Sequence, residues 1–370
     1  MKVTIQSDEL QKKLSFVSHA ISTRSQLPIL LHVLLEAKDG KLQLSATDLE
    51  IGIETSLPAT IEEEGSITIP AKLFLELVNS LPADKVVLQT KGTTVEVICR
   101  RVKSNLAGLS HEEFPTLFED RGEPVITLAQ ENIRKYFSRV CFAASTDTTR
   151  PALSGILLQK KEEGYLLVAT DGYRLSLQKN ISIEENAAKA DEQPILIPAR
   201  VIREVLSEKG SESTSIFISR QNNQVLFEHA ESLLIGRLIE AEYPKYQKII
   251  PADFSTKIFF DRDEMQKAIK TCAIFARETA NIIKLSIKKD AVVVSANTPS
   301  VGDNVVEVES KLEGEENEIA FNARYLLDLF ANIEAEQMSF EMTGPLNSGV
   351  FRIANDPSFL HLIMPIRTQG

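Results

Sequence analysis

The hydrophobic and polar positions of this chain repeat one pattern three times. The three copies span residues 3–21, 126–144 and 258–276. Each begins with a short alternation of apolar and polar residues and continues with apolar residues three or four positions apart. Alternation of period two predicts a β-strand, and a period near 3.6 predicts an amphipathic helix. In the first copy the apolar stripe of the predicted helix is formed by Leu10, Leu14, Val17 and Ile21.

A second strand-then-helix pattern lies halfway through each copy, at residues 67–78, 195–206 and 319–330. Further alternating segments follow, separated by turn signals such as Asp39-Gly40. We therefore expect an α+β fold in which each repeat has two strand–helix–strands halves, with two helices and roughly eight strands. A repeat of roughly 125 residues indicates tandem domains and not a short-period solenoid. The expected domains are residues 1–122, 123–250 and 251–370.

Composition narrows the class of protein. The chain is 43% hydrophobic and 25% charged, which is ordinary for a globular protein. Cys99, Cys141 and Cys272 are far apart and have no metal-ligand spacing, so we expect buried thiols, no metal and no cofactor. The chain starts directly on a predicted strand, and no apolar run reaches the length of a membrane span. A cytoplasmic, nucleoid-associated protein with no membrane partner is expected.

The net charge of −11 argues by itself against nucleic acid as a partner. The basic residues, however, are concentrated on the first helix of each copy. After their opening turns these helices carry eight basic residues and no acidic one: Lys12, Lys13, Arg134, Lys135, Arg139, Lys267, Lys270 and Arg277. Lys72, Arg200 and Arg324 share one position of the second helices. A solvated helix face would explain one such helix. Three equivalent helices favour a cationic track that contacts phosphates without reading sequence.

Several local motifs also follow one another in a recognisable order. They are LPIL at 27–30, ATD at 46–48 and 169–171, FNARYLLD at 321–328 and MPIR at 364–367. With the threefold repeat, they make the whole chain resemble the β subunit of bacterial DNA polymerase III, the sliding-clamp family. The resemblance implies a head-to-tail homodimer that forms a ring around double-stranded DNA, with helices inside and sheets outside. It also implies a clamp without catalytic activity that confers processivity in replication. The implied partners are a clamp loader, the polymerase α subunit and other proteins with clamp-binding motifs.

The resemblance implies a partner-peptide pocket where the second and third domains meet. Its residues would be Leu153, Thr170, Gly172, Tyr173, Arg174, Leu175, Pro244, Lys248, Ile249, Leu362, Met364, Pro365, Ile366 and Arg367. Leu175 and Leu362 have a plain alternative, because ordinary core residues would look the same in the sequence. Tyr173 and Lys248 depart from common choices of the family. The tail Thr368–Gly370 extends past its usual end.

The resemblance also assigns DNA contacts and a subunit joint. The implied DNA contacts are Arg24, Arg150, Arg200 and Asn322. Pro151 and Ala152 stand where paired tyrosines can occur in the family. The implied joint brings Ile274 and Phe275 of one subunit to the segment of Lys103, Ser104 and Leu106 of the other. Ser104 replaces an aromatic residue there.

An enzyme and a scaffold that does not bind DNA are the alternatives. Asp48 and Asp171 are the only carboxylates that recur within the same short motif, ATD. Asx turns explain them better than catalysis does. The five histidines share no spacing, and no P-loop, GxGxxG, GxSxG or HExxH motif occurs. A scaffold would carry the same basic helices but show no dependence on DNA.

Overall fold

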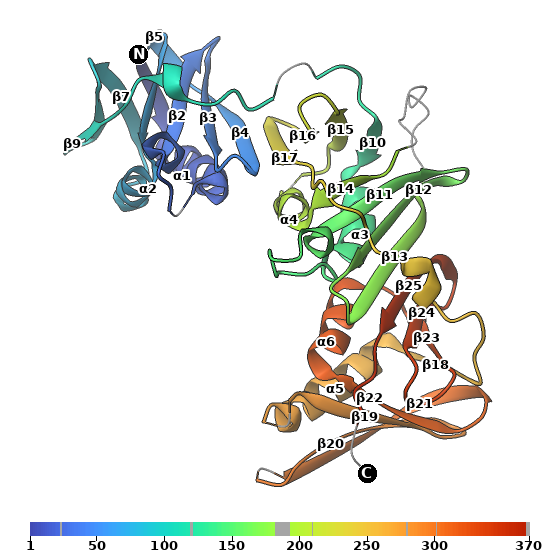
Figure 1. Ribbon diagram of the computed structural model, residues 1–370. Helices are drawn as coiled ribbons and strands as arrows, with labels where there is room; N and C mark the ends of the chain where they lie inside the picture. The colour runs from blue at the N-terminus through green and yellow to red at the C-terminus, as the bar shows by residue number, and fades with distance from the viewer. Residues whose placement is uncertain are drawn as a thin grey trace. The chain divides into compact units, whose positions relative to one another are not determined.

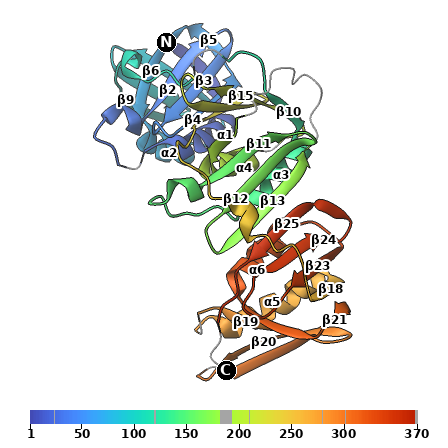
Figure 2. The same ribbon diagram turned by 45° about the vertical axis from the view of Figure 1, so that its right-hand side comes forward.

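The computed structural model describes residues 1–22, 24–118, 121–181, 193–208, 210–278, 280–300 and 302–367. Two compact units are present within them. The first unit contains residues 1–130 and 203–238, and the second contains 131–181, 193–202 and 239–367. Figures 1 and 2 show strands and helices in both units, as the α+β prediction required.

Six α-helices occur in the described residues, and each follows directly on a strand, which confirms the repeated pattern read from the sequence. Their bounds are α1 Ser7–Val17, α2 Ala71–Ser80, α3 Gln130–Cys141, α4 Ala199–Ser207, α5 Arg262–Ala276 and α6 Ala323–Asn332. Leu10, Leu14 and Val17 of α1 are fully buried. The aligned stripe of α5 is buried as well. The apolar stripes therefore attach each helix to its sheet, and the opposite faces stay polar.

The first unit contains two antiparallel sheets. The five-stranded sheet has the order β5 (Thr60–Glu63), β1 (Lys2–Gln6), β7 (Lys85–Lys91), β8 (Thr94–Cys99) and β9 (Val102–Ala107). The eight-stranded sheet has the order β10 (Ile126–Ala129), β15 (Ser213–Ser219), β16 (Gln224–His229), β17 (Ser232–Arg237), β4 (Ile51–Pro58), β3 (Lys41–Thr47), β2 (His32–Lys38) and β6 (Gly65–Pro70). Helix α1 packs on β3, β4 and α2. The pairing of β17 with β4 joins the second repeat to the first through backbone hydrogen bonds.

The second unit is built on one twelve-stranded sheet. Its order is β14 (Ile195–Pro198), β11 (Gly155–Lys161), β12 (Gly164–Thr170), β13 (Arg174–Ile181), β25 (Asp356–Ile363), β24 (Gly349–Ile353), β23 (Gln337–Met342), β18 (Thr256–Asp261), β21 (Gly302–Gly314), β20 (Ala291–Thr298), β19 (Ile282–Ile287) and β22 (Asn317–Asn322). Helix α5 packs on β20, β21 and α6. Both views show β13 beside β25, where the second repeat meets the third.

The cysteines behave as their positions in the sequence predicted. Cys99, Cys141 and Cys272 are buried free thiols. The Cys272 thiol lies 3.4 Å from the carbonyl oxygen of Val294, and burial raises its pKa to about 11. Because these thiols are packed in the core, they act as small apolar residues.

Candidate functional sites

The turn between β12 and β13 displays one aromatic side chain. Asp171 Oδ1 accepts hydrogen bonds from the N–H groups of Tyr173 (2.8 Å) and Arg174 (3.0 Å). Gly172, with φ of 94°, occupies a left-handed conformation that suits glycine. This confirms the Asx-turn interpretation of Asp171, and Asp48 makes the same bonds to Glu50 and Ile51. The consequence is a rigid turn from which Tyr173 projects, 58% exposed.

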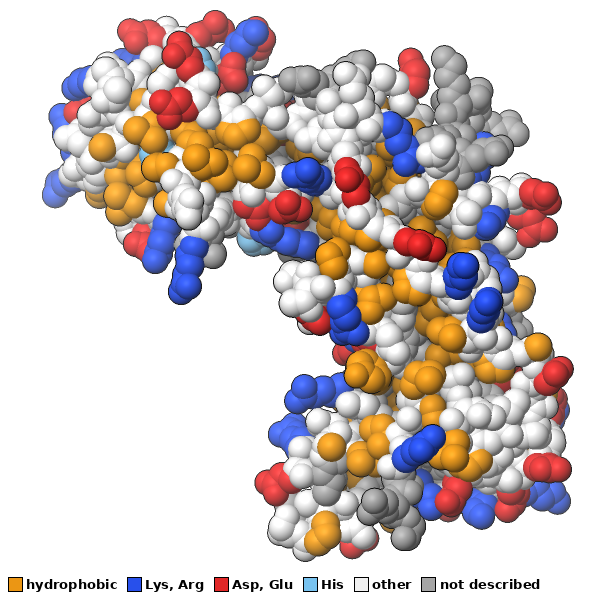
Figure 3. All heavy atoms as spheres, in the orientation of Figure 1, with side chains coloured by type: hydrophobic (Ala, Val, Ile, Leu, Met, Phe, Trp, Pro, Cys, Tyr) orange, Lys and Arg blue, Asp and Glu red, His pale blue; other side chains and the backbone are white. Residues whose placement is uncertain are grey.

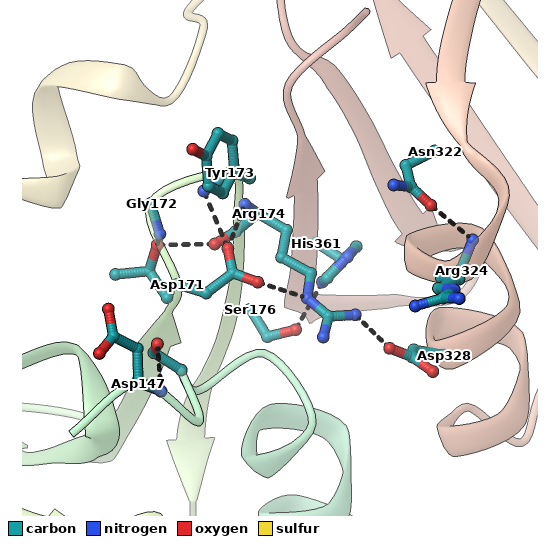
Figure 4. A network of polar contacts seen from close by, with 12 residues as sticks. Asp147, Asp171, Gly172, Tyr173, Arg174, Ser176, Asn322, Arg324, Asp328 and His361 are labelled. Carbon is teal, nitrogen blue, oxygen red and sulfur yellow. Dashed lines mark hydrogen bonds and ion pairs between the residues drawn. The ribbon is translucent and has the colours of Figure 1, made fainter. Parts of the chain in front are cut away.

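Arg174 ties this turn to helix α6 (Figure 4). Its Nε lies 3.0 Å from Asp171 Oδ2, and its Nη1 lies 2.6 Å from Asp328 Oδ2. The guanidinium also lies 4.6 Å from the ring centroid of Tyr325. A buried guanidinium held by two carboxylates and an aromatic face has a fixed position. Arg174 therefore sets the position of Tyr173 relative to α6.

Leu175 and Leu362 form the buried floor beneath this region. They face each other across β13 and β25 and are fully buried. They belong to one apolar cluster with Leu177, Leu360 and Tyr246. Leu175 and Leu362 are therefore core residues, as the plain alternative stated. Other residues form the exposed surface of the candidate peptide site.

The exposed surface is formed by residues from three segments. Tyr173 comes from the turn, Ile249 from the segment after the second repeat, and Met364, 45% exposed, from the C-terminal segment. The N–H of Met364 donates to the carbonyl oxygen of Tyr173 at 2.8 Å, and the N–H of Ile366 donates to that of Ala320. Pro244, Lys248 and Arg367 are also exposed, while Leu153, Pro365 and Ile366 are half-buried and Thr170 is buried. Figure 3 shows hydrophobic side chains at the surface beside α6 and the end of β13.

The tail Thr368–Gly370 lies outside the described residues. Its effect on the rim of the peptide site stays a prediction.

Most basic side chains of the candidate DNA interface are exposed. They are Lys12, Arg24, Lys72, Arg134, Lys135, Arg150, Arg200, Lys267 and Lys270. Lys12 lies 2.8 Å from Glu9, and Arg150 lies 3.0 Å from Asp147. Lys13 is half-buried and donates to Thr55 Oγ1. Asn322 caps α6, because its Oδ1 accepts from the N–H of Arg324.

Arg139 does not belong to that interface, which corrects the sequence prediction. Its side chain is only 7% exposed, and Nη1 lies 2.8 Å from Asp356 Oδ2 and 3.0 Å from Gln178 Oε1. A phosphate could reach it only by breaking a buried ion pair. The charge of Arg139 therefore links α3 to the start of β25, and we remove it from the residues proposed to contact DNA.

Replacing Asp356 with Ala should destabilise the second unit by about 3 kcal/mol, because it leaves the Arg139 charge buried without a partner. Burial opposes ionisation of Asp356, but the bonds from Ser358 and Arg139 outweigh it and lower its pKa. The stabilisation is therefore present above the ordinary carboxyl pKa and is lost as the pH falls through the lowered value. Urea unfolding at pH 7 and at acid pH checks both statements. An Asp356→Ala protein as stable as the parent at pH 7 would contradict the first.

The residues assigned to the joint lie beside two sheet edges. Strand β9 is the edge of the five-stranded sheet, where Lys103 is exposed and Ser104 half-buried. Residues 302–309 of β21 pair only with β20 among the described strands. Ile274 on α5 is 58% exposed and Phe275 is half-buried. Leu106 is buried within its own sheet, so it offers backbone and no exposed side chain.

The structure adds Val305 to the candidate joint. Its side chain, on the open part of β21, is among the most exposed hydrophobic ones. The neighbouring residues Asp303, Glu307 and Glu309 are acidic, whereas β9 carries Lys103. The alternation of side chains along a strand could have pointed to Val305. The sequence did not show, however, which strand is unpaired on one side.

Within the described residues, no cluster of three or more His, Cys, Asp and Glu side chains could hold a metal ion. None of the helices in the described part of the chain has the length and hydropathy needed to span a membrane.

Comparison with known proteins gives consistent matches along the whole chain. Models of the DNA polymerase III beta subunit match in three parts: the N-terminal domain at residues 1–118, the central domain at 127–245 and the C-terminal domain at 247–367. The beta sliding clamp of Bacillus subtilis is 31% identical and that of Staphylococcus aureus 30%, each with full coverage of both chains. The solved Bacillus subtilis clamp superposes with a TM-score of 0.92 at 30% identity, with full coverage of both chains. A clamp from Bartonella birtlesii, bound to griselimycin, has a TM-score of 0.90 at 26% identity and the same coverage.

Proposed function

Because the chain belongs to the family of bacterial DNA polymerase III β subunits, the sliding clamps, we propose that it closes into a head-to-tail homodimeric ring around duplex DNA. Its role is that of a non-catalytic processivity clamp. The match over the full length of the chain is the observation that carries this function. We propose three domains, residues 1–122, 123–250 and 251–370, of which six would make one ring.

The DNA contacts are assigned to basic residues of α1 to α5 and of the turns near them, together with Asn322 at the start of α6. In the first helix of each repeat, Lys or Arg follows the acidic first turn. Such side chains can neutralise phosphates whatever the base sequence, and the acidic remainder of the surface would repel DNA elsewhere. A clamp that must slide needs this kind of contact. The proposed residues are Lys12, Lys13, Arg24, Lys72, Arg134, Lys135, Arg150, Arg200, Lys267, Lys270 and Asn322.

The subunit joint is assigned to β9 of one protomer and the open part of β21 of the other. Each strand offers unpaired backbone groups, and pairing two such edges removes the risk of unspecific aggregation. Lys103 would face the acidic side chains of β21, and Ile274, Phe275 and Val305 would supply the apolar contact. Repeated head-to-tail joints close into a ring when the rotation allows it.

Partner proteins are assigned to the surface formed by Tyr173, Ile249, Met364 and their neighbours. Apolar side chains lie there beside the cations Lys248 and Arg367, a combination that suits a short apolar peptide with acidic or amide flanks. The polymerase α subunit, the clamp loader and other proteins with clamp-binding motifs would use this site in turn. Arg174 would act as its positioning residue.

A topological experiment tests the ring. The protein is loaded onto nicked circular plasmid by a clamp loader, and the plasmid is then cut once. We expect loss from linear DNA and retention on circles at a salt concentration that screens phosphate contacts, because only the circle prevents a ring from sliding off. Retention on linear DNA at that salt concentration would rule out a sliding ring and favour a phosphate-bound scaffold.

Charge reversal tests the assigned DNA contacts. The double variant Lys267→Glu, Lys270→Glu should shorten retention on circular DNA several-fold at low salt, because two exposed phosphate contacts on α5 become repulsive. The matched control is Lys288→Glu, Lys289→Glu, which changes the net charge equally at an exposed turn after β19. Equal retention of the two variants would contradict the assignment to the helices.

A further inference from the structure

The structure contains two equivalent junctions between successive repeats. In the first unit β4 pairs with β17, and in the second unit β13 pairs with β25. Positions 123 residues apart, such as 3 and 126, correspond in the first two repeats. Gly52 pairs with Ile235 at the first junction, as Leu175 pairs with Leu362 at the second. Two residues further along the same face, Glu54 pairs with Leu233 as Leu177 pairs with Leu360. Each position at one junction can therefore be compared with its counterpart at the other.

The floors of the two junctions differ in chemistry. In the second unit one row across four strands is entirely apolar: Leu157, Val168, Leu177 and Leu360. All four are buried, in the apolar cluster that also contains Tyr246. The corresponding row in the first unit is Leu34, Ser45, Glu54 and Leu233. Ser45 and Glu54 thus occupy the central positions of the row, where the second unit has Val168 and Leu177.

A cavity lies over this polar row. Its volume is about 280 Å³, near the lower end of the range of about 300–1,000 Å³ for small-molecule pockets. The row forms its floor together with Glu36 and Gln43, and Phe114, Leu117 and Ile235 contribute apolar walls. All of these residues belong to the first unit. A space of this size admits one side chain or a small molecule, but not a folded segment.

The charge around the cavity is unbalanced. Glu36 and Glu54 both line it, and among the described lining residues Arg121 is the only Lys or Arg. Arg121 is already engaged, since its Nη1 lies 3.0 Å from Glu228 Oε1. His111 also lines the cavity. Burial raises the pKa of Glu54, and Arg121, Gln43 and Ser45 offset this only in part. A half-buried carboxylate with incomplete compensation gains stability from an added cation.

We propose that this cavity is a binding site for a small organic cation with an apolar stem, an alkylammonium or alkylguanidinium group. The cationic head would lie between Glu54 and Glu36. The stem would pack on Leu34, Leu233 and Ile235. A lysine or arginine side chain of a partner and a free amine share this chemistry. The site is distinct from the peptide surface in the second unit and does not depend on the proposed ring.

Methyl NMR of the full-length protein tests the site directly. The probes are n-butylammonium, the peptide Ac-Ala-Lys-Ala-NH2, and n-pentanol as a neutral analogue. We expect saturable shifts of the Leu34 and Leu233 methyl signals with butylammonium and none with pentanol. Glu54→Gln should weaken binding at least tenfold, while Glu63→Gln, an exposed carboxylate on β5, should leave it unchanged.

The outcomes separate the sources of the cation. Stronger binding of the lysine peptide than of butylammonium would assign the site to a partner side chain, and the reverse order would assign it to a free amine. Shifts that do not saturate, or equal affinity of the parent and Glu54→Gln proteins, would overturn the proposal. The methyl spectrum itself reports whether each variant is folded.

Discussion

Truncation of the chain after Ile363 should weaken the binding of a polymerase α-subunit peptide at least 100-fold while leaving the dimer intact. The deletion removes Met364, the exposed apolar residue of the C-terminal segment, together with half-buried Ile366 and the cation Arg367. It also removes the hydrogen bond from Met364 to the turn that carries Tyr173. Loss of a central apolar anchor and its neighbours removes most of the binding free energy of a short peptide. Fluorescence anisotropy with a labelled peptide measures the effect.

The position of the cut is decided by burial. Ile363 is fully buried in the core of the third repeat and pairs with Arg174, so a deletion that included it would damage the fold. A protein lacking only residues 368–370 serves as the matched control and should bind within a few-fold of the parent. Unchanged peptide affinity after the longer truncation would exclude the assigned surface. A truncated protein that became monomeric would show that these residues serve the joint instead.

Ile274→Asp should convert the dimer into a monomer at micromolar concentration. In the proposed joint this side chain is buried against the neighbouring subunit. An unpaired carboxylate placed there costs several kcal/mol, which corresponds to a rise of several decades in the dissociation constant. Light scattering or sedimentation should then give 41.1 kDa in place of about twice that mass.

A suitable control for this substitution lies in the same repeat. Leu346 is 61% exposed, close to the 58% of Ile274, and lies between β23 and β24. Leu346→Asp should leave the dimer intact, and both variants should keep the parent's circular-dichroism spectrum because neither residue is buried within its own chain. A dimer that survives Ile274→Asp would contradict the assigned joint. Dissociation caused by both variants would show that the effect is not specific to α5.

The sequence was sufficient for the features that depend on local periodicity. The apolar stripe of Leu10, Leu14 and Val17 predicted α1 and its buried face, and the same spacing recurred in the other copies. Asp48 and Asp171 were assigned to Asx turns from the ATD motif alone. These features involve residues within a few positions of one another, so the chain determines them without reference to its tertiary contacts.

The sequence did not reveal the surroundings of charged side chains. Arg139 follows the basic pattern of the leading helices, yet Asp356 lies 217 positions away and holds its side chain in a buried pair. Arg174 was assigned to the peptide site without its partner on α6, Asp328. A basic residue looks the same in the sequence whether it faces solvent or a distant carboxylate, and only the packing of the strands distinguishes the two.

The threefold repeat, the helices and the family were thus determined by the sequence, because periodicity and motif order survive without coordinates. The tertiary structure decided which repeated positions kept their common role. Strand register placed Glu54 where the next repeat has Leu177, and it left residues 302–309 of β21 paired on one side only among the described strands. Register and edges are properties of pairing between segments far apart in the chain, so no local pattern could have revealed them.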